Sequence, residues 1–147
     1  MHPLVVCAIF KQEAHYLKEW IEFHRIQGFS KFFLYNNNSN DNYLEVLQPY
    51  IDKGIVDLTE WPMQSPSQLQ AYSDFIAKNN KKPVWAAMID IDEFLFAPTG
   101  SLPELLNKFD HPSSSCLTPG IFFSVPSHCE AGALLIFASS TALATAE

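Results

Sequence analysis

The sequence predicts an α/β domain in which a mostly parallel sheet is flanked by helices. Two observations lead to this expectation: strand-like and helix-like segments alternate along the chain, and each connection is long enough for a right-handed crossover between parallel strands. The chain has 147 residues, of which 48% are hydrophobic. A chain of this length buries about 70% of its unfolded surface, which suffices for one core without disulfide bonds.

The first strand–helix unit is marked by a change of hydrophobic period. Residues Leu4–Phe10 form an uninterrupted apolar run, which is typical of a strand covered on both faces. From Glu13 to Gln27 apolar residues recur instead at helical spacing, and Gly28 follows at the position of a C-cap. This unit therefore predicts a buried strand followed by an amphipathic helix.

The same alternation continues to residue 89. Asn42 and Glu45 have the spacing of a capping box, while Ser65, Pro66 and Gln68 together form a helix start signal. The expected elements are a strand over Lys31–Tyr35, a helix between Asn42 and Gly54, a strand over Ile55–Trp61, a helix beginning at Ser65 and a strand over Val84–Ile89.

Beyond Phe96 the pattern changes. We expect a short helix over Leu102–Phe109 and a strand over Gly120–Val125. Residues 131–147 are rich in Ala, Ser and Thr without a clear period, and we assign no element to them. The sequence thus divides into a domain over residues 1–130 and an unassigned tail over residues 131–147.

The charge balance excludes several classes of partner. The chain has 9 basic and 16 acidic residues and a formal net charge of -7, which disfavours nucleic acid and anionic lipid as ligands. Any other anionic ligand would need a local cation or a helix N-terminus.

Cysteine usage and the termini indicate the compartment. Cys7, Cys116 and Cys129 form no C-x-x-C pair, which argues against a disulfide framework or a zinc ribbon. The N-terminus has neither the basic region nor the cleavage site of a signal peptide, and no apolar run approaches the ~20 residues needed to cross a bilayer. We therefore expect a cytoplasmic protein without a membrane-spanning segment.

Polar clusters follow each of the four predicted strands up to residue 89. They occupy residues 11–13, 36–41, 60–64 and 90–93. The carboxyl ends of parallel strands meet at one edge of a sheet, where loops and helix N-termini form ligand sites. Four clusters on one edge predict a cleft with hydrogen-bonding and ionic capacity.

The last of these clusters contains a D-x-D motif. In an extended segment, Asp90 and Asp92 point to the same side while Ile91 points toward the core. Two carboxylates held together without a neighbouring Lys or Arg repel each other unless a cation neutralises them, and oxygen ligands favour Mg²⁺ or Mn²⁺. A solvated strand end is the alternative for an isolated D-x-D, but the position opposite three polar loops favours a metal site.

Several linked motifs resemble a known family. The segments Val6–Lys11, Glu13–His24, Phe33–Ser39 and Ala87–Phe96, together with Asp41–Asn42, are similar to those of nucleotide-sugar glycosyltransferases of the GT-A fold. In particular they resemble glycosyltransferase family 92 and its bacterial family-2-like relatives, over about residues 4–110. The resemblance implies a Rossmann-like GT-A half with a truncated C-terminal part.

The resemblance also implies a reaction and a site. The reaction is transfer of a sugar from a UDP-type nucleotide-sugar to a glycan or another acceptor, with Mn²⁺ or Mg²⁺ held by Asp90 and Asp92. The catalytic base is not identified. The residues implied in binding the nucleotide-sugar are Lys11, Glu13, Asn36, Asn38, Asp41 and Asp90.

Two other functions remain open. One is a non-catalytic module that binds a nucleotide and a metal. The other is a phosphatase of the haloacid-dehalogenase type, in which the first Asp of a D-x-D is the nucleophile. Such phosphatases carry the motif after their first strand, whereas Asp90 follows the fourth predicted strand and precedes Glu93-Phe94.

Other chemically capable side chains are assigned first to packing. His15 and His24 are nine residues apart on the predicted helix, and therefore lie on opposite sides of it. Trp61 is assigned to the core, with contact to the base or sugar as its alternative. For His128, the resemblance implies a possible metal ligand.

Overall fold

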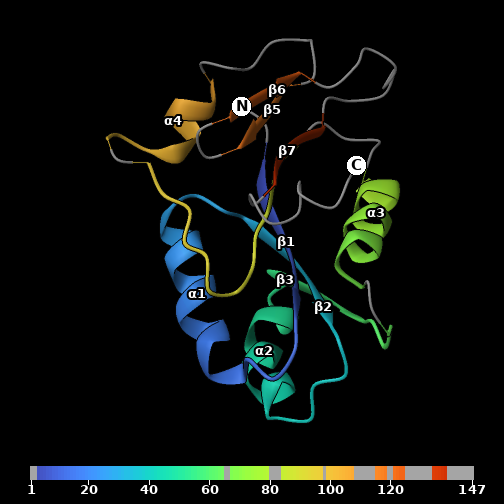
Figure 1. Cartoon of the computed structure of the whole chain (residues 1–147). Helices are drawn as coiled ribbons and strands as arrows, with labels where there is room; N and C mark the ends of the chain where they lie inside the picture. The colour runs from blue at the N-terminus through green and yellow to red at the C-terminus, as the bar shows by residue number, and fades with distance from the viewer. Residues whose placement is uncertain are drawn as a thin grey trace.

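A five-stranded, all-parallel sheet forms the centre of the molecule (Figure 1). The computed structural model describes residues 3–64, 67–79, 84–97 and 99–107, and the strands at 115–118, 121–124 and 134–138. The strand order is β3-β2-β1-β4-β7, and β5 and β6 form a separate antiparallel pair. The sheet confirms the predicted α/β class.

The elements alternate as the sequence predicts. None of the helices in the described part of the chain is long and apolar enough to cross a membrane. In chain order the elements are β1 (Leu4–Phe10), α1 (Ala14–Ile26), β2 (Lys31–Asn36), α2 (Tyr43–Asp52), β3 (Val56–Glu60), α3 (Ser67–Asn79), β4 (Val84–Met88), α4 (Leu102–Asn107), β5 (Ser115–Thr118), β6 (Ile121–Ser124) and β7 (Leu134–Ala138).

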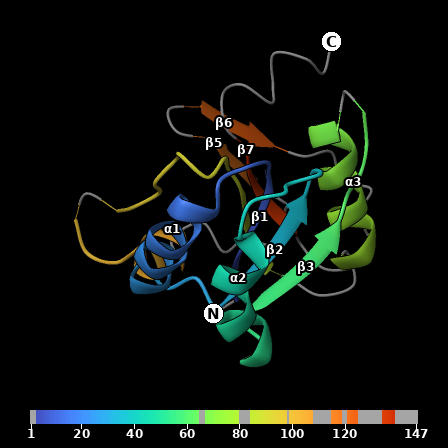
Figure 2. The ribbon, with the colours of Figure 1, turned by 90° about the horizontal axis from the view of Figure 1, so that it is seen from below.

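Helices cover both faces of the sheet, which explains why β1 is apolar throughout. Val6 and Phe10 belong to the core cluster shared with α1, α2 and α4, whereas Val5 and Cys7 belong to the cluster shared with α3. Figure 2 shows α1 and α2 on one side of the strands and α3 on the other. Successive residues of a strand face opposite sides, so each position of β1 meets a helix layer and is buried or nearly so.

The ends of three strands lie level with one another. Phe10 of β1 pairs with Asn36 of β2, and Asn36 pairs in turn with Glu60 of β3. The segments that follow these strands therefore begin side by side, as the parallel arrangement predicts. This register brings residues 11–13, 36–41 and 60–64 to one edge of the sheet.

The predicted elements differ from the structure at a few positions. Asn42 occupies the N-cap position of α2, but its side chain makes no capping hydrogen bond, so the predicted capping box is wrong. The predicted cap Ser65 and the residue Pro66 lie outside the described residues. The segment left unassigned contributes β7, which pairs in parallel with β4.

Two buried side chains of α1 hold the chain that follows β4. Trp20 Nε1 donates a hydrogen bond to the backbone oxygen of Glu93 at 2.8 Å. His24 Nε2 accepts from the backbone N–H of Leu95 at 3.2 Å, and His24 Nδ1 lies 2.8 Å from the backbone oxygen of Trp20. This pattern fixes a neutral ring with its proton on Nδ1. Uncharged groups of α1 thus position the segment after the D-x-D motif.

We expect His24 to make the stability of the fold depend on pH. Burial lowers its pKa from 6.5 to about 4. Between these values the unfolded chain binds more protons than the folded chain. The free energy of unfolding therefore falls as the pH drops through this window, by about 3 kcal/mol for this group.

Denaturant unfolding of the parent chain and of His24→Gln measures this effect. Glutamine supplies an acceptor but does not titrate, and all carboxylates are common to both proteins. The variant should therefore lose about 3 kcal/mol less than the parent between neutral and acidic pH. If both proteins lost the same free energy of unfolding, the pH dependence would not come from His24.

Candidate functional site

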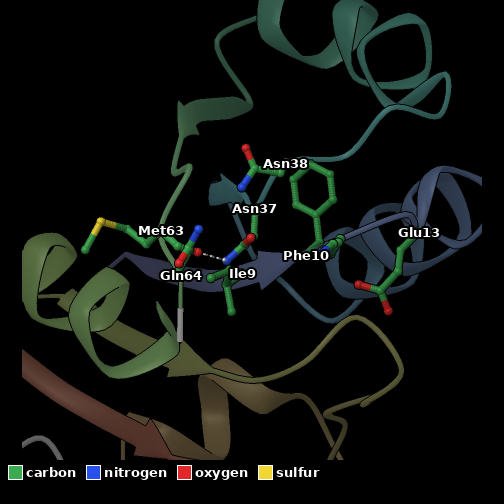
Figure 3. A pocket seen from close by; sticks show the side chains of 8 residues that line it. Ile9, Phe10, Glu13, Asn37, Asn38, Met63 and Gln64 are labelled. Carbon is green, nitrogen blue, oxygen red and sulfur yellow. Dashed lines mark hydrogen bonds between the residues drawn. The ribbon is translucent and has the colours of Figure 1, made fainter. Parts of the chain in front are cut away.

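A cavity of about 750 Å³ opens at the carboxyl ends of β1 and β2 (Figure 3). This volume is in the range of sites for small molecules and cofactors. Its wall combines apolar side chains with amides, one lysine and one carboxylate. The lining residues are Ile9, Phe10, Lys11, Glu13, Asn37, Asn38, Met63 and Gln64.

Three of the residues predicted to bind the nucleotide line this cavity. They are Lys11, Glu13 and Asn38. The sequence indicated the segments 36–41 and 60–64 but did not single out Asn37 or Gln64, which also line it. Only the fold shows which members of a polar cluster turn toward the cavity.

Asn36 supports the wall of the cavity from a buried position outside the lining. Its side chain is 1% exposed and lies outside the cavity lining. Its Nδ2 donates to Glu60 Oε2 at 2.8 Å, and its Oδ1 accepts from the backbone N–H of Ser39 at 3.0 Å. Asn36 therefore links the end of β2 to the end of β3 and starts the turn of the following loop.

Asp41 ties the same loop to α1. Its Oδ2 accepts a hydrogen bond from the backbone N–H of Ala14 at 2.9 Å, which satisfies one of the free N–H groups at the start of that helix. Its Oδ1 is buried and has no hydrogen-bond partner among the described residues. A buried carboxylate oxygen without a partner is a suitable acceptor or cation ligand.

The D-x-D motif lies in a turn. Strand β4 ends at Met88, and the backbone N–H of Glu93 donates to the oxygen of Asp90 at 3.1 Å. The backbone N–H of Asp90 donates to Glu93 Oε2 at 2.9 Å. The expectation of an extended segment is therefore wrong, because this turn begins at Asp90. Ile91 is 1% exposed, as predicted for the residue facing the core.

The carboxylates at this edge repel one another. The pKa of Asp90 is raised by burial and then by the charge of Asp92, although a hydrogen bond from Gln68 opposes the shift. The pKa of Glu93 is raised by burial and by the charges of Asp90 and Asp92, against a hydrogen bond from the Asp90 backbone. The turn thus concentrates negative charge in a partly buried place.

Glu13 connects this charge to the cavity. Its pKa is raised first by burial and further by the charges of Asp92, Asp90 and Asp41, while a backbone hydrogen bond at Lys11 acts in the opposite direction. Glu13 also lines the cavity, whereas Asp90 and Asp92 do not. The acidic turn and the cavity are therefore neighbouring parts of one edge.

The carboxylates described at this edge do not form a complete metal site by themselves. The described residues contain no group of three or more His, Cys, Asp or Glu side chains arranged to hold a metal ion. Mg²⁺ is commonly bound by one or two carboxylates together with the phosphates of a substrate. The arrangement suits a cation that arrives with an anionic ligand.

Other candidate residues take part in packing. His15 is exposed, and its ring lies tilted beside that of Tyr16, whereas His24 is buried. Neither side chain lines the cavity. Trp61 packs its ring edge-on against Tyr35 at 5.3 Å. The position of His128 falls outside the described residues.

This geometry defines a class of protein. A parallel α/β sheet with a polar cavity and carboxylates beyond its strand ends has the organisation of a Rossmann-like α/β domain. Residues 2–130 match the sequence model of glycosyltransferase family 92. The chain belongs to that family.

Individual relatives agree with this assignment. A glycosyltransferase family 92 protein of Oryza sativa subsp. japonica is 34% identical over 111 residues, which is 74% of this chain and 19% of the relative. Family 92 proteins of Ricinus communis and Arabidopsis thaliana are each 30% identical, over 67% of this chain and 18% and 17% of their own lengths. The chain spans about a fifth of the length of these relatives.

We expect Asp90→Asn to stabilise the chain in the absence of divalent metal. Asparagine removes one of the repelling charges and keeps an oxygen for the hydrogen bond from Gln68 Nε2. Near neutral pH the gain should reach up to about 1 kcal/mol, the range for single pairs of partly exposed charges.

Urea unfolding in the presence of a chelator measures this gain. Because the pKa of Asp90 is raised in the folded chain, the parent recovers stability as the pH falls and Asp90 becomes protonated. The difference between the two proteins should therefore shrink toward acidic pH. A variant less stable than the parent at neutral pH would show that the charges do not repel.

Proposed function

We propose that the chain is the part of a glycosyltransferase that binds a UDP-type nucleotide-sugar. Membership of family 92 supports the reaction class. The observation that carries the proposal is the position of Glu13. This residue lines a cavity of nucleotide size, and the charges of Asp92 and Asp90 contribute to raising its pKa. A nucleotide in the cavity would thus have its phosphates beside the acidic turn.

The lining residues suit the parts of such a ligand. The carboxamides of Asn38 and Gln64 supply hydrogen-bond donors and acceptors for a base or ribose, and Phe10 and Met63 supply apolar contact. Lys11 supplies the local cation that an acidic chain needs to hold a diphosphate. Asn36 and Asp41 support the wall of this site from outside it.

Asp90 and Asp92 are the residues that would hold Mn²⁺ or Mg²⁺. The raised pKa values of Asp90, Glu93 and Glu13 indicate negative charge that a cation would neutralise. When held there, such a cation would supply positive charge to offset the charge that develops on the diphosphate as the bond to the sugar breaks. Lys11 would orient the diphosphate, and the hydrogen bond from Gln68 keeps Asp90 in place.

The rival functions differ in measurable products. A non-catalytic module would bind nucleotide and metal and leave the nucleotide-sugar intact. A glycosyltransferase would transfer the sugar of the donor to an acceptor, or hydrolyse the donor, and would release UDP in either case. A phosphatase would release inorganic phosphate from simple esters. Family membership favours the transferase over the phosphatase. In this proposal the sugar goes to a glycan or another acceptor.

We expect Mn²⁺ and UDP together to stabilise the chain against heat more than the sum of their separate effects, because the cation is shared by protein and diphosphate. A ligand at 100 times its dissociation constant adds about 2.7 kcal/mol to the free energy of unfolding. Asp92→Asn should remove the part of this gain that requires metal. Thermal unfolding with each ligand alone and with both measures it.

Asp52→Asn provides the matched control. Asp52 is an exposed carboxylate at the end of α2, and its variant should respond to Mn²⁺ and UDP like the parent. An unchanged response of Asp92→Asn would refute the metal role of the D-x-D motif. Failure of the parent to respond to UDP, with or without Mn²⁺, would refute nucleotide binding.

A further inference from the structure

The loop over residues 36–41 uses most of its side chains to hold its own shape. Asn36 and Asp41 anchor its two ends, as described above. Asn37 Nδ2 donates to the backbone oxygen of Met63 at 3.3 Å. Ser39 Oγ accepts from the backbone N–H of Gln12, and Asn40 Oδ1 accepts from Gln12 Nε2. Polar side chains that look alike in the sequence are therefore already engaged.

Asn38 is the exception. It is exposed and lines the cavity, and within the described part of the chain its side chain makes no hydrogen bond. Its backbone is left-handed, with φ of 54°, a conformation that Asn tolerates better than most residues. Figure 3 shows Asn38 beside Asn37 at the wall of the cavity. The loop thus leaves the Asn38 carboxamide available to a ligand.

Gln12 is the residue that fixes this arrangement. Its own φ of 59° is also left-handed, which is unusual for a residue other than Gly, Asn or Asp. Its Oε1 accepts from the backbone N–H groups of Asn40 at 2.8 Å and Asp41 at 3.3 Å. With the contacts to Ser39 and Asn40 named above, Gln12 engages both the backbone and the side chains of the second half of the loop.

Gln12 itself does not line the cavity. It follows β1 directly, while the loop follows β2, so its contacts bridge two strand ends across 28 residues of sequence. An unusual backbone conformation that the surroundings enforce is a feature of preorganised functional sites. The contacts of Gln12 therefore hold the loop in the conformation in which the Asn38 carboxamide is available at the cavity.

We propose that Gln12 is a positioning residue that holds the 36–41 loop in its binding conformation, so that Asn38 contacts the nucleotide without prior rearrangement. The proposal rests on the proposed function, because it takes the ligand of the cavity to be a nucleoside diphosphate. Gln12 acts through the loop and touches neither the nucleotide nor the metal.

Gln12→Met tests the proposal because methionine has a similar length and makes none of the side-chain hydrogen bonds to Asn40 and Asp41, while it keeps the backbone N–H that donates to Ser39. If the variant keeps the loop in its binding conformation about a tenth of the time, its apparent dissociation constant for UDP rises about tenfold. Calorimetric titration of UDP in the presence of Mn²⁺ measures this constant. Gln48→Met is the matched control, since Gln48 is exposed on α2 and bonds only to Asp52 among the described residues.

Amide hydrogen exchange separates loop order from overall stability. In Gln12→Met the amides of Asn40 and Asp41 should exchange faster, while those of β1 and β2 keep their parental protection. Gln12→Glu retains an acceptor for both amides and should restore their protection. A purely structural role would change the protection of the strands as well and would not be rescued in this local way.

The outcomes separate this proposal from the one it rests on. If the parent binds UDP and Gln12→Met binds it within twofold of the parent, the positioning role is refuted. Unchanged protection of the Asn40 and Asp41 amides in Gln12→Met refutes it as well. If the parent itself does not bind UDP, the proposed function fails and the role of Gln12 toward a nucleotide fails with it.

Discussion

The acidic turn at residues 90–93 keeps its position through hydrogen bonds between the backbone at Glu93 and Leu95 and two uncharged, buried side chains of α1. Trp20 holds the backbone of Glu93, and His24 holds the backbone of Leu95. An anchoring lysine or arginine would instead have neutralised the carboxylates. Neutral anchors fix the backbone of the turn and leave its charge unbalanced. Burial keeps the His24 ring neutral, because it lowers the pKa of this histidine to about 4.

Much of the fold could be predicted because it depends on patterns that a single sequence contains. The apolar run Leu4–Phe10 requires cover on both faces, and the helical periods that follow it supply that cover on alternate sides. Parallel connections then place every strand end at one edge. The level pairing of Phe10, Asn36 and Glu60 brings together segments that are far apart in the sequence. The position of the cavity at this edge follows from the same topology.

The details of the site depend on tertiary contacts that no local pattern encodes. Asn36 and Asn38 are the same residue type two positions apart, yet Asn36 is buried against Glu60 while Asn38 is exposed at the cavity. The left-handed backbone of Gln12 arises from contacts with a loop 27 to 29 residues away. The turn at Asp90 likewise depends on the side chain of Glu93 folding back onto the backbone. Residue type alone could not distinguish these roles.

Partial burial together with mutual repulsion distinguishes the acidic turn from an ordinary acidic surface. Elsewhere on the described surface, Asp57 pairs with Lys31 at 2.8 Å and Asp74 with Lys78 at 2.6 Å. No such ion pair involves Asp90, Asp92 or Glu93 within the described residues. An acidic surface that served only solubility would gain from similar pairing, because unpaired, partly buried carboxylates destabilise the folded chain. Residues kept in a destabilising arrangement are typical of functional sites, and this arrangement supports the cation that we propose for this edge.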